Sequence, residues 1–258
     1  MSTRSRSTLR GVFITGTDTG VGKTVVAAAL AAWCRWRGVD VGVMKPIATG
    51  ARKRAGNRLL ADDTRLLAWA AETRDPVSLI TPVCYREPLA PAVAAQRAGR
   101  PVDWRLIRSS YVTLARRHEV MIVEGVGGLL VPCSRAQTVA DLIRMLDLPV
   151  LVVGRLRLGT LNHTLLTVRQ AVHEGLRVCG VVLNAADGPA SDPAARLAER
   201  TNPDALASYL SLSASSIPLL GVLPHDPGVA SPRPSRTHLA RWIDRHVNRS
   251  WLNSLRLH

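Results

Sequence analysis

A glycine-rich stretch, GTDTGVGKT at residues 16–24, follows the apolar run GVFIT and ends on a lysine and a hydroxyl. Gly20 and Gly22 would let the backbone pass close to a phosphate group. A helix that begins at Lys23 would direct its free N–H groups and its dipole at that anion. Lys23 would then reach the β- and γ-phosphates of a nucleotide, and the Thr24 hydroxyl would bind Mg²⁺. The stretch therefore predicts a nucleotide site.

The spacing of this stretch differs from the standard phosphate-binding loop. The standard pattern has four residues between its first glycine and Gly-Lys-Thr, whereas five follow Gly16 here, and Thr17 stands at the standard glycine place. A strand that ends at Thr15, followed by a turn and a helix, still provides the geometry that a phosphate needs. The alternative is an ordinary glycine-rich turn between strand and helix; the context and the Gly-Lys-Thr ending favour the nucleotide site.

Transfer of a phosphoryl group also requires carboxylates for a metal ion and further positive charge. Glu124 ends a strand-like run in VEGVGG, and Lys45 ends another in MKPIATG, which adds a hydroxyl at Thr49. In open parallel sheets, ligands bind outside the carboxyl ends of the strands, so we expect these side chains beside the glycine-rich stretch. Lys45 is most simply a second phosphate clamp. A merely exposed lysine and a solvated glutamate in a turn are the alternatives.

The elements that would position these residues alternate between strand and helix. Runs rich in Val, Ile and Leu, with little alternation, are typical of strands buried on both faces. They lie at residues 11–15, 39–45, 119–125, 149–154, 177–184 and 218–223. Helix-sized segments lie at residues 23–37, 63–72, 103–117, 138–146 and 160–174. This order predicts an α/β fold with a mostly parallel sheet and helices on both faces.

Length and composition agree with one large domain. The chain has 258 residues, and its apolar content of 47% is enough for a substantial core. Because no apolar run reaches the roughly 18 residues of a membrane span, we expect no membrane association. The four cysteines are far apart and form no Cys-x-x-Cys pair. They predict reduced thiols in a cytoplasmic protein rather than a metal cluster or a disulfide framework.

The two ends of the chain differ from its middle. Residues 1–10 are polar and basic, and we expect a short flexible tail there, with an organelle transit peptide as the alternative. Residues 11–224 contain the alternating elements. Residues 225–258 form a basic extension that begins turn-rich and then shows helical spacing. We expect the extension to cover a sheet edge or to pack on a partner.

The net charge of +15 raises the question of a nucleic-acid partner. The basic residues are mostly arginines spread along the whole chain, and they form no patch interleaved with aromatic residues. We therefore expect no nucleic-acid function. An arginine-rich surface that also favours anionic substrates is the simpler interpretation.

Three motifs together resemble the dethiobiotin synthetase family, ATP-dependent ring-closing ligases of biotin biosynthesis. The family's loop, Gly-Thr-Asp-Thr-x-Val-Gly-Lys-Thr, is matched in full by residues 16–24, including the early glycine. Its Lys-Pro-x-x-Ser/Thr-Gly motif is matched by residues 45–50, and its Glu-Gly-x-Gly-Gly motif by residues 124–128. The segments REPLAPAVAAQRAGRPVD and RLGTLNHTLLT are also similar to the family. The resemblance covers about residues 11–224 and implies a single-domain P-loop NTPase fold.

The resemblance also implies a reaction. The substrates would be 7,8-diaminononanoate (7,8-diaminopelargonate), CO₂ and ATP, with Mg²⁺, and the product dethiobiotin, in the penultimate step of biotin biosynthesis. One amine takes up CO₂ as a carbamate, and the γ-phosphoryl group of ATP converts the carbamate into a carbamic-phosphoric anhydride. The second amine then closes the ring as phosphate leaves. The protein would contribute positioning and charge stabilisation, so no nucleophilic side chain is needed.

Catalytic and substrate-binding residues are assigned by the matched positions. Lys23 would bind the β- and γ-phosphates and stabilise the transferred phosphoryl group. Lys45 would contact the γ-phosphate and the carbamate, and Thr49 would hydrogen-bond the reacting groups. Asn162 matches a contact to the substrate carboxylate that the family supplies across a dimer interface. A homodimer is therefore expected.

The resemblance assigns the metal to Thr24, Glu124 and one aspartate in LLADDTRLL. That aspartate opens a helix after the second strand, and the leucines that follow favour Asp63 over Asp62. Either aspartate could instead be a helix N-cap, and we expect that one of them is.

The nucleotide would contact the glycine-rich loop and two residues that follow later strands. Asn184, at the end of GVVLN, matches the asparagine that reads the adenine edge, and the segment around Pro224 would lie near the same base. The loop residues assigned to ATP are Thr17, Asp18, Thr19, Gly20, Val21, Gly22, Lys23 and Thr24.

Other functions fit the residues less well. A cobyrinate-type amidoligase usually carries a glutaminase domain, for which 258 residues leave no room. A partitioning or metal-insertion ATPase would be expected to show a lysine early in its loop, where Thr17 stands. His163 lies in a matched segment, but a packing or interface role is favoured over acid-base catalysis. Arg157 replaces a lysine of some family members and keeps positive charge near an acidic substrate.

Overall fold

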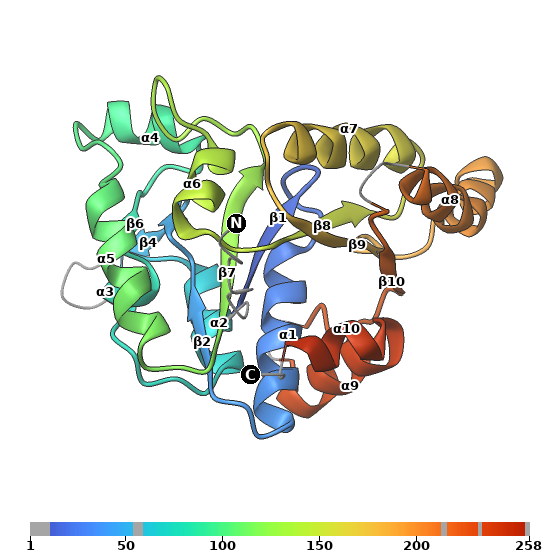
Figure 1. Ribbon diagram of the computed structural model, residues 1–258, viewed down its shortest axis with the longest axis horizontal. Coiled ribbons are helices and arrows are strands. Elements are labelled where there is room, and N and C mark those ends of the chain that lie inside the picture. The colour runs from blue at the N-terminus through green and yellow to red at the C-terminus, as the bar shows by residue number, and fades with distance from the viewer. Residues whose placement is uncertain (1–10, 54–58, 213–215, 232–233, 256–258) are drawn as a thin grey trace, which may run out of the picture.

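The structure, a computed structural model, describes residues 11–53, 59–212, 216–231 and 234–255. The tail expected at residues 1–10 therefore lies outside the described residues. The strands of the main sheet are β1 (Gly11–Gly16), β2 (Val41–Met44), β7 (Val120–Gly128), β8 (Val150–Arg155), β9 (Val178–Asn184) and β10 (Leu219–Leu223). They confirm the six strands predicted from the apolar runs. All of them are parallel, in the order β10-β9-β8-β1-β7-β2 (Figure 1).

Both faces of the sheet are buried. Neighbouring residues of a strand point to opposite faces of the sheet, and buried side chains are found on each face. In β1, Val12 and Ile14 belong to one core cluster, whereas Phe13 belongs to the other. All three side chains are fully buried. This double burial explains why the strands are almost continuously apolar in sequence.

Helices cover each face, as predicted. The first face is covered by α1 (Lys23–Trp36), α2 (Asp62–Ala70), α9 (Arg236–His246) and α10 (Arg249–Ser254). The second face is covered by α4 (Pro91–Arg97), α5 (Trp104–Ala115), α6 (Val139–Leu146), α7 (Thr160–His173) and α8 (Pro193–Ser211). The short α3 (Val77–Ile80) lies between α2 and α5.

The helical spacing predicted after residue 235 is confirmed by α9 and α10. Figure 1 shows α9 beside α1, and α9 also contacts the edge strand β10. The indole N–H of Trp33 in α1 donates a hydrogen bond to Asp244 Oδ1 at 2.9 Å. An isolated bridge joins Gly221 to Val247. The described part of the C-terminal extension thus covers an edge of the sheet.

Several elements were not predicted. Helix α8 contains Pro203 and begins with Pro193, and much of its surface is exposed, so its apolar pattern is weak. The two-stranded pairs β3 (Ile47–Ala48) with β6 (Val83–Cys84), and β4 (Arg52–Lys53) with β5 (Leu59–Leu60), are too short to show a periodic pattern. These small sheets form in the connections between the main elements.

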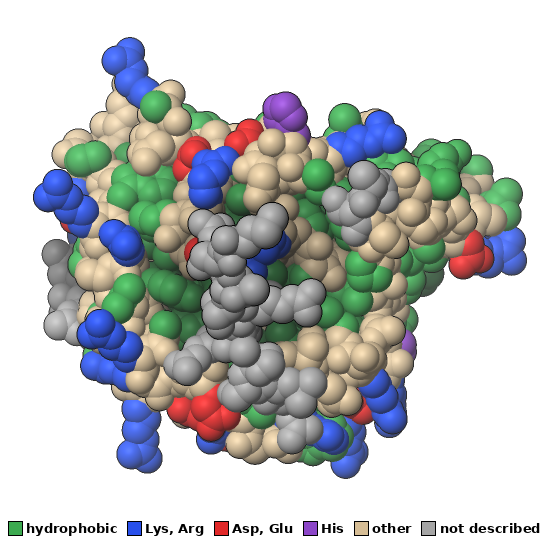
Figure 2. Space-filling view, in the orientation of Figure 1, with side chains coloured by type: hydrophobic (Ala, Val, Ile, Leu, Met, Phe, Trp, Pro, Cys, Tyr) green, Lys and Arg blue, Asp and Glu red, His purple; other side chains and the backbone are tan. Residues whose placement is uncertain are grey.

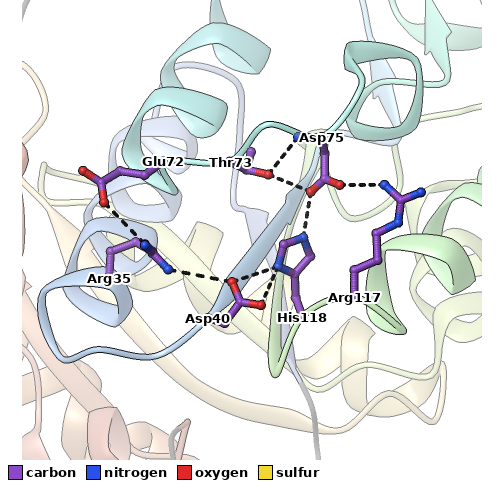
Figure 3. A network of polar contacts seen from close by, with 7 residues as sticks. All are labelled: Arg35, Asp40, Glu72, Thr73, Asp75, Arg117 and His118. Atoms are coloured by element: carbon purple, nitrogen blue, oxygen red, sulfur yellow. Dashed lines mark hydrogen bonds and ion pairs between the residues drawn. The ribbon is translucent and has the colours of Figure 1, made fainter.

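A polar network joins elements at the amino edge of the sheet, opposite the glycine-rich loop (Figure 3). His118 lies between two carboxylates, with Nδ1 3.1 Å from Asp40 and Nε2 2.7 Å from Asp75. Arg117 also donates to Asp75 at 2.9 Å. Burial alone would raise the pKa of Asp75, but hydrogen bonds from Thr73, His118 and Arg117 outweigh it and lower that pKa. The network ties the starts of β2 and β7 to the connection between α2 and α3.

Two further features concern the sequence predictions. None of the described helices is long and apolar enough to cross a membrane. No disulfide bond joins the four cysteines, all of which lie within the described residues.

Candidate functional site

The glycine-rich stretch forms the connection between β1 and α1, at the carboxyl edge of the sheet. Gly22 directly precedes α1 and has a φ of 92°. A Cβ atom at this position would lie 2.0 Å from Nδ2 of Asn184, so only glycine fits both the conformation and the space. Because α1 begins at Lys23, its free N–H groups face this loop. That arrangement favours an anion such as phosphate.

The lysine of the loop is folded back onto the loop itself. Its Nζ donates to the carbonyl oxygen of Asp18 at 2.7 Å, and the residue is 6% exposed. Burial lowers the pKa of Lys23 to about 8, and the charge of Lys45 adds to this effect against the influence of nearby carboxylates. The two lysines therefore point into the same site, close enough for the charge of Lys45 to lower the pKa of Lys23.

Lys45 lies at the centre of an ionic cluster. Its Nζ is 2.7 Å from Glu124 Oε1, 2.9 Å from Asp63 Oδ2 and 3.0 Å from the carbonyl oxygen of Gly125. Burial alone would lower the pKa of Lys45, but Glu124 and Asp63 outweigh it and raise that pKa. Lys45 is consequently a fully charged cation at neutral pH, held by two carboxylates that come from different elements.

The residues around Lys45 fit a magnesium ion. Thr24 donates from its hydroxyl to Glu124 Oε1 at 2.7 Å, so two carboxylates and one hydroxyl meet at one point. The other carboxylate oxygen of Glu124, Oε2, is buried and has no hydrogen-bond partner among the described residues. Oxygen ligands of this kind suit Mg²⁺, which usually binds one or two carboxylates and completes its shell with water and phosphate. The described residues hold no group of three or more His, Cys, Asp or Glu side chains that could bind a metal.

The two neighbouring aspartates have different surroundings. Asp63 contacts Lys45, whereas Asp62 pairs with Arg65 at 3.6 Å near the surface. The expectation that one of the aspartates is a helix N-cap is wrong, because Ala61 occupies that position. Both carboxylates lie in the first turn of α2, where the helix dipole favours negative charge.

A cavity of about 390 Å³ opens on one side of the loop. It is lined by Thr17, Asp18, Val21, Arg155, Arg157, Leu158, Thr160, His163 and Asp187. Arg155 donates to the carbonyl oxygen of Gly20 at 3.1 Å and pairs with Asp187 at 3.4 Å. Sequence reasoning missed Arg155 and Asp187. Arg155 is the last residue of β8, so the rule that ligands bind at the carboxyl ends of strands could have identified it.

The positive charge expected at Arg157 is partly neutralised. Its guanidinium lies 3.7 Å from Asp187 and 3.6 Å from Glu199. It also donates to the carbonyl oxygen of Gly188 at 3.3 Å. Arg157 thus helps to hold the cavity wall in place.

A second cavity, of about 60 Å³, lies on the other side of the loop. It is lined by Gly22, Val25, Asn184, Ala185, Ala186, Pro224, His225, Asp226, Val229, Ala230 and Trp242. Asn184, the last residue of β9, is buried and donates to the carbonyl oxygen of Val21 at 3.0 Å. The structure thus brings Asn184 and Pro224 to the loop, as the sequence predicts. Trp242 was not assigned to the site from sequence.

Two predicted residues stand apart from these contacts. Thr49 follows β3 and is half-buried, and its hydroxyl makes no hydrogen bond to another described residue. Asn162 is exposed in the first turn of α7 and lines neither of the two cavities beside the loop within one protomer. His163, from the same turn, does line the larger cavity. The predicted phosphate loop, metal cluster and base region are therefore together, whereas Asn162 is separate.

Comparisons with known proteins agree with this geometry. A family model described as an AAA domain matches residues 10–233. The chain is 43% identical over 219 residues to the ATP-dependent dethiobiotin synthetase BioD of Bacillus licheniformis, covering 84% of this chain and 86% of the relative. It is 45% identical over 204 residues to the enzyme of that name from Anaeromyxobacter dehalogenans (strain 2CP-C), covering 77% and 89%. With the enzyme of that name from Bacillus subtilis (strain 168), the identity is 36% over 245 residues, covering 95% and 97%.

These relatives cover between 77% and 95% of this chain. The residues matched by the family model include the loop, the Lys45 cluster and Asn184. The chain belongs to the ATP-dependent dethiobiotin synthetase family.

Proposed function

We propose that this protein is an ATP-dependent dethiobiotin synthetase that closes the ureido ring of dethiobiotin from 7,8-diaminononanoate and CO₂, with ADP and phosphate as the other products. One observation carries the proposal. Two buried lysines, Lys23 and Lys45, and the carboxylate of Glu124 converge beside a helix N-terminus that is open to phosphate. A site of this composition can bind the triphosphate and stabilise a phosphoryl group in transfer.

The proposed chemistry needs charge stabilisation rather than a nucleophilic side chain. The carbamate formed from one amine and CO₂ takes the γ-phosphoryl group of ATP. The carbamate oxygen thereby becomes part of a phosphate leaving group. Lys23 and Lys45 offset the negative charge that spreads over the phosphoryl oxygens, and Thr49 positions the reacting groups. The second amine then attacks the carbamoyl carbon, and phosphate departs as the ring closes.

Lys23 changes its partner in this proposal. In the structure, its ammonium donates to the carbonyl oxygen of Asp18 within the loop. A phosphate in the loop would offer Lys23 a charged acceptor, which binds an ammonium more strongly than a neutral carbonyl does. The contact to Asp18 thus keeps the ammonium inside the loop until the nucleotide arrives.

Thr24, Asp63 and Glu124 are the residues that would hold Mg²⁺, which when bound neutralises charge on the β- and γ-phosphates. Asp63 and Glu124 already contact one cation, the ammonium of Lys45, and Thr24 donates a hydrogen bond to Glu124. The arrangement of these three residues therefore depends on Lys45 as an internal counter-ion. We propose that Lys45 also contacts the carbamate.

We assign the base of ATP to the side of the loop where Asn184 and Pro224 lie. The side-chain amide nitrogen of Asn184 donates a hydrogen bond to the carbonyl oxygen of Val21, which holds this part of the loop against β9. The rest of the nucleotide would follow the loop from Thr17 to Thr24. Residues of this loop line both cavities, so the phosphates would lie between the base and the acidic substrate.

A homodimer completes the proposal. Asn162 is exposed, and so are two leucines near it, Leu158 at 73% and Leu166 at 59% exposure. Asn162 and Leu166 are four residues apart in α7 and so share one side of the helix, while Leu158 lies just before the helix begins. Large exposed leucines beside Asn162 are consistent with a surface that another chain covers. We propose that Asn162 of the partner subunit reaches the carboxylate of the substrate.

The surplus of basic residues is explained by anionic substrates rather than by nucleic acid. Figure 2 shows Lys and Arg side chains scattered over this view of the molecule and along its outline. ATP and diaminononanoate both carry negative charge, which a basic surface attracts. We also propose that the protein is cytoplasmic. Its four cysteines are free, and free thiols are typical of proteins in that compartment.

The test is an assay of the purified chain with diaminononanoate, bicarbonate, Mg²⁺ and ATP, in which dethiobiotin is measured by mass spectrometry. The wild type is expected to form dethiobiotin and ADP in equal amounts. Lys23→Ala is expected to lower turnover by at least about a hundredfold, the scale of losing one charge stabiliser. Lys53→Ala is the matched control, because Lys53 is exposed on β4. ATP hydrolysis without dethiobiotin, or near-normal turnover of Lys23→Ala, would overturn the proposal.

A further inference from the structure

We propose that α9 belongs to the nucleotide site, with Trp242 and His238 as positioning residues that hold the segment Pro224–Asp226 against Asn184. These residues thereby set the affinity for the nucleotide base. The inference rests on the proposed function, because it takes the smaller cavity as the base site. It assigns a role to the C-terminal part of the chain that the three sequence motifs do not reach.

The segment needs an anchor because strand pairing stops before it. The last ladder hydrogen bond in this direction runs from the N–H of Ala185 to the carbonyl oxygen of Leu223, at 2.9 Å. The next residue, Pro224, has no N–H group and cannot continue the ladder. Its carbonyl oxygen remains available as an acceptor. The indole N–H of Trp242 donates to that oxygen at 3.3 Å.

Trp242 also forms part of the cavity itself. It is 4% exposed and lines the same space as Gly22 and Asn184. A tryptophan with this burial offers a large apolar wall and a single donor. The indole N–H donates to Pro224, and the apolar ring lines the cavity.

A second side chain of α9 holds the far end of the segment. His238 Nε2 lies 2.8 Å from Asp226 Oδ2. The other oxygen of Asp226 accepts from the N–H groups of Gly228 and Val229, at 2.8 and 3.2 Å. Asp226 therefore closes a tight turn, and His238 attaches this turn to α9.

Helix α9 is in turn attached to the helix of the phosphate loop. It packs along α1, and Trp33 of α1 donates to Asp244 of α9 at 2.9 Å. Since α1 begins at Lys23, one pair of packed helices connects the phosphate end of the site to the wall around the base. A change in α9 should consequently alter nucleotide binding more than binding of the amine substrate.

The test compares two tryptophan-to-phenylalanine changes in the full chain. Trp242→Phe keeps an aromatic ring but deletes the indole N–H together with the second ring. Trp36→Phe is the matched control, because Trp36 is 46% exposed on α1 and lines neither cavity beside the loop. Trp242→Phe is expected to weaken ATP binding about threefold to tenfold, the effect of one lost hydrogen bond, in titration calorimetry with Mg–ATP. Its KM for ATP should rise equally, while its kcat and its KM for diaminononanoate change by less than about twofold.

Several outcomes decide the matter. Discrimination between ATP and GTP should fall in Trp242→Phe, since the segment that faces the base is less ordered. Unchanged ATP affinity, or equal losses for both substrates, would overturn the inference. If Trp242→Phe fails to fold, His238→Ala provides the same test, because it removes the side chain that contacts Asp226. Because calorimetry does not require dethiobiotin formation, a wild type that makes no dethiobiotin refutes the proposed function, while weaker ATP binding by the variant still supports the inference.

Discussion

Removal of the Lys45 ammonium is the most informative perturbation of this site. In Lys45→Met, the apolar stem is kept and the charge is lost. Glu124 is 1% exposed, so its carboxylate would stay buried without its partner, whereas Asp63 at 41% side-chain exposure can turn toward water. Breaking a buried ion pair by removing one partner costs about 3–5 kcal/mol of the free energy of unfolding. In a chain of this size, that corresponds to a decrease in Tm on the order of 10 °C.

The loss should depend on pH in a defined direction. Glu124 and Asp63 raise the pKa of Lys45, so its contribution to stability is fully present below the ordinary lysine pKa of 10.5 and does not vary near neutrality. Burial raises the pKa of Glu124 in the wild type, although the charge of Lys45 acts against it. In the variant this opposing charge is lost, so we expect the pKa to rise further and protonation at acid pH to relieve the cost. The stability difference between wild type and Lys45→Met should therefore shrink as the pH falls from 7 to 5.

The double variant Lys45→Met with Glu124→Gln separates stability from activity. It has no buried charge left without a partner, so most of the lost stability should return. Turnover should remain at least about a hundredfold below wild type, because the double variant lacks both the Lys45 cation and the Glu124 carboxylate proposed to hold Mg²⁺. Urea denaturation and the dethiobiotin assay measure the two quantities. Normal turnover of Lys45→Met, or a double variant as unstable as the single one, contradicts this account of the cluster.

Three further predictions concern single residues. Asp63→Asn should raise the Mg²⁺ concentration needed for half-maximal turnover by about tenfold or more, the scale of altering a metal site. Asp62→Asn, the control, should stay within about twofold of wild type. Equal effects of the two variants in a Mg²⁺ titration would refute the choice of Asp63. ATP affinity should be highest below pH 8 and fall above it, because the pKa of Lys23 is about 8 and only its ammonium form attracts phosphate; calorimetry that shows constant affinity from pH 7 to 9 would contradict this. Asp75→Asn should lower the free energy of unfolding by about 1–3 kcal/mol at pH 7. Since the folded-state pKa of Asp75 is lowered, that difference should disappear only below its ordinary value of 3.8, in urea denaturation at several pH values.

Local sequence patterns predicted much of the fold. The six main strands were found because strands buried on both faces are apolar at nearly every position, as in Val12, Phe13 and Ile14 of β1. The phosphate loop was found because its glycines, lysine and threonine are consecutive. In contrast, α8 was missed, since Pro203 interrupts a mostly polar segment. The pattern of α9 was visible, but its contact with α1 was not.

Contacts between distant residues depended on the order of the strands. The sequence predicts that Glu124 and the loop share one edge of the sheet, and the β1–β7 pairing then places Glu124 opposite Ile14. Nothing near Asn184 in the chain indicates its hydrogen bond to Val21, which lies 163 residues away. Trp242 is likewise brought to the cavity beside Gly22 and Asn184 only when α9 packs on α1.

The sequence alone determined the parallel sheet, the loop, and the residue types available for phosphate and metal. These features depend on short-range steric rules and on the burial pattern of consecutive residues. The tertiary structure decided which charges pair, which cavity each side chain lines and which surface stays exposed. Those outcomes depend on how the crossover helices order the strands and on packing between segments far apart in the chain, which no local pattern records.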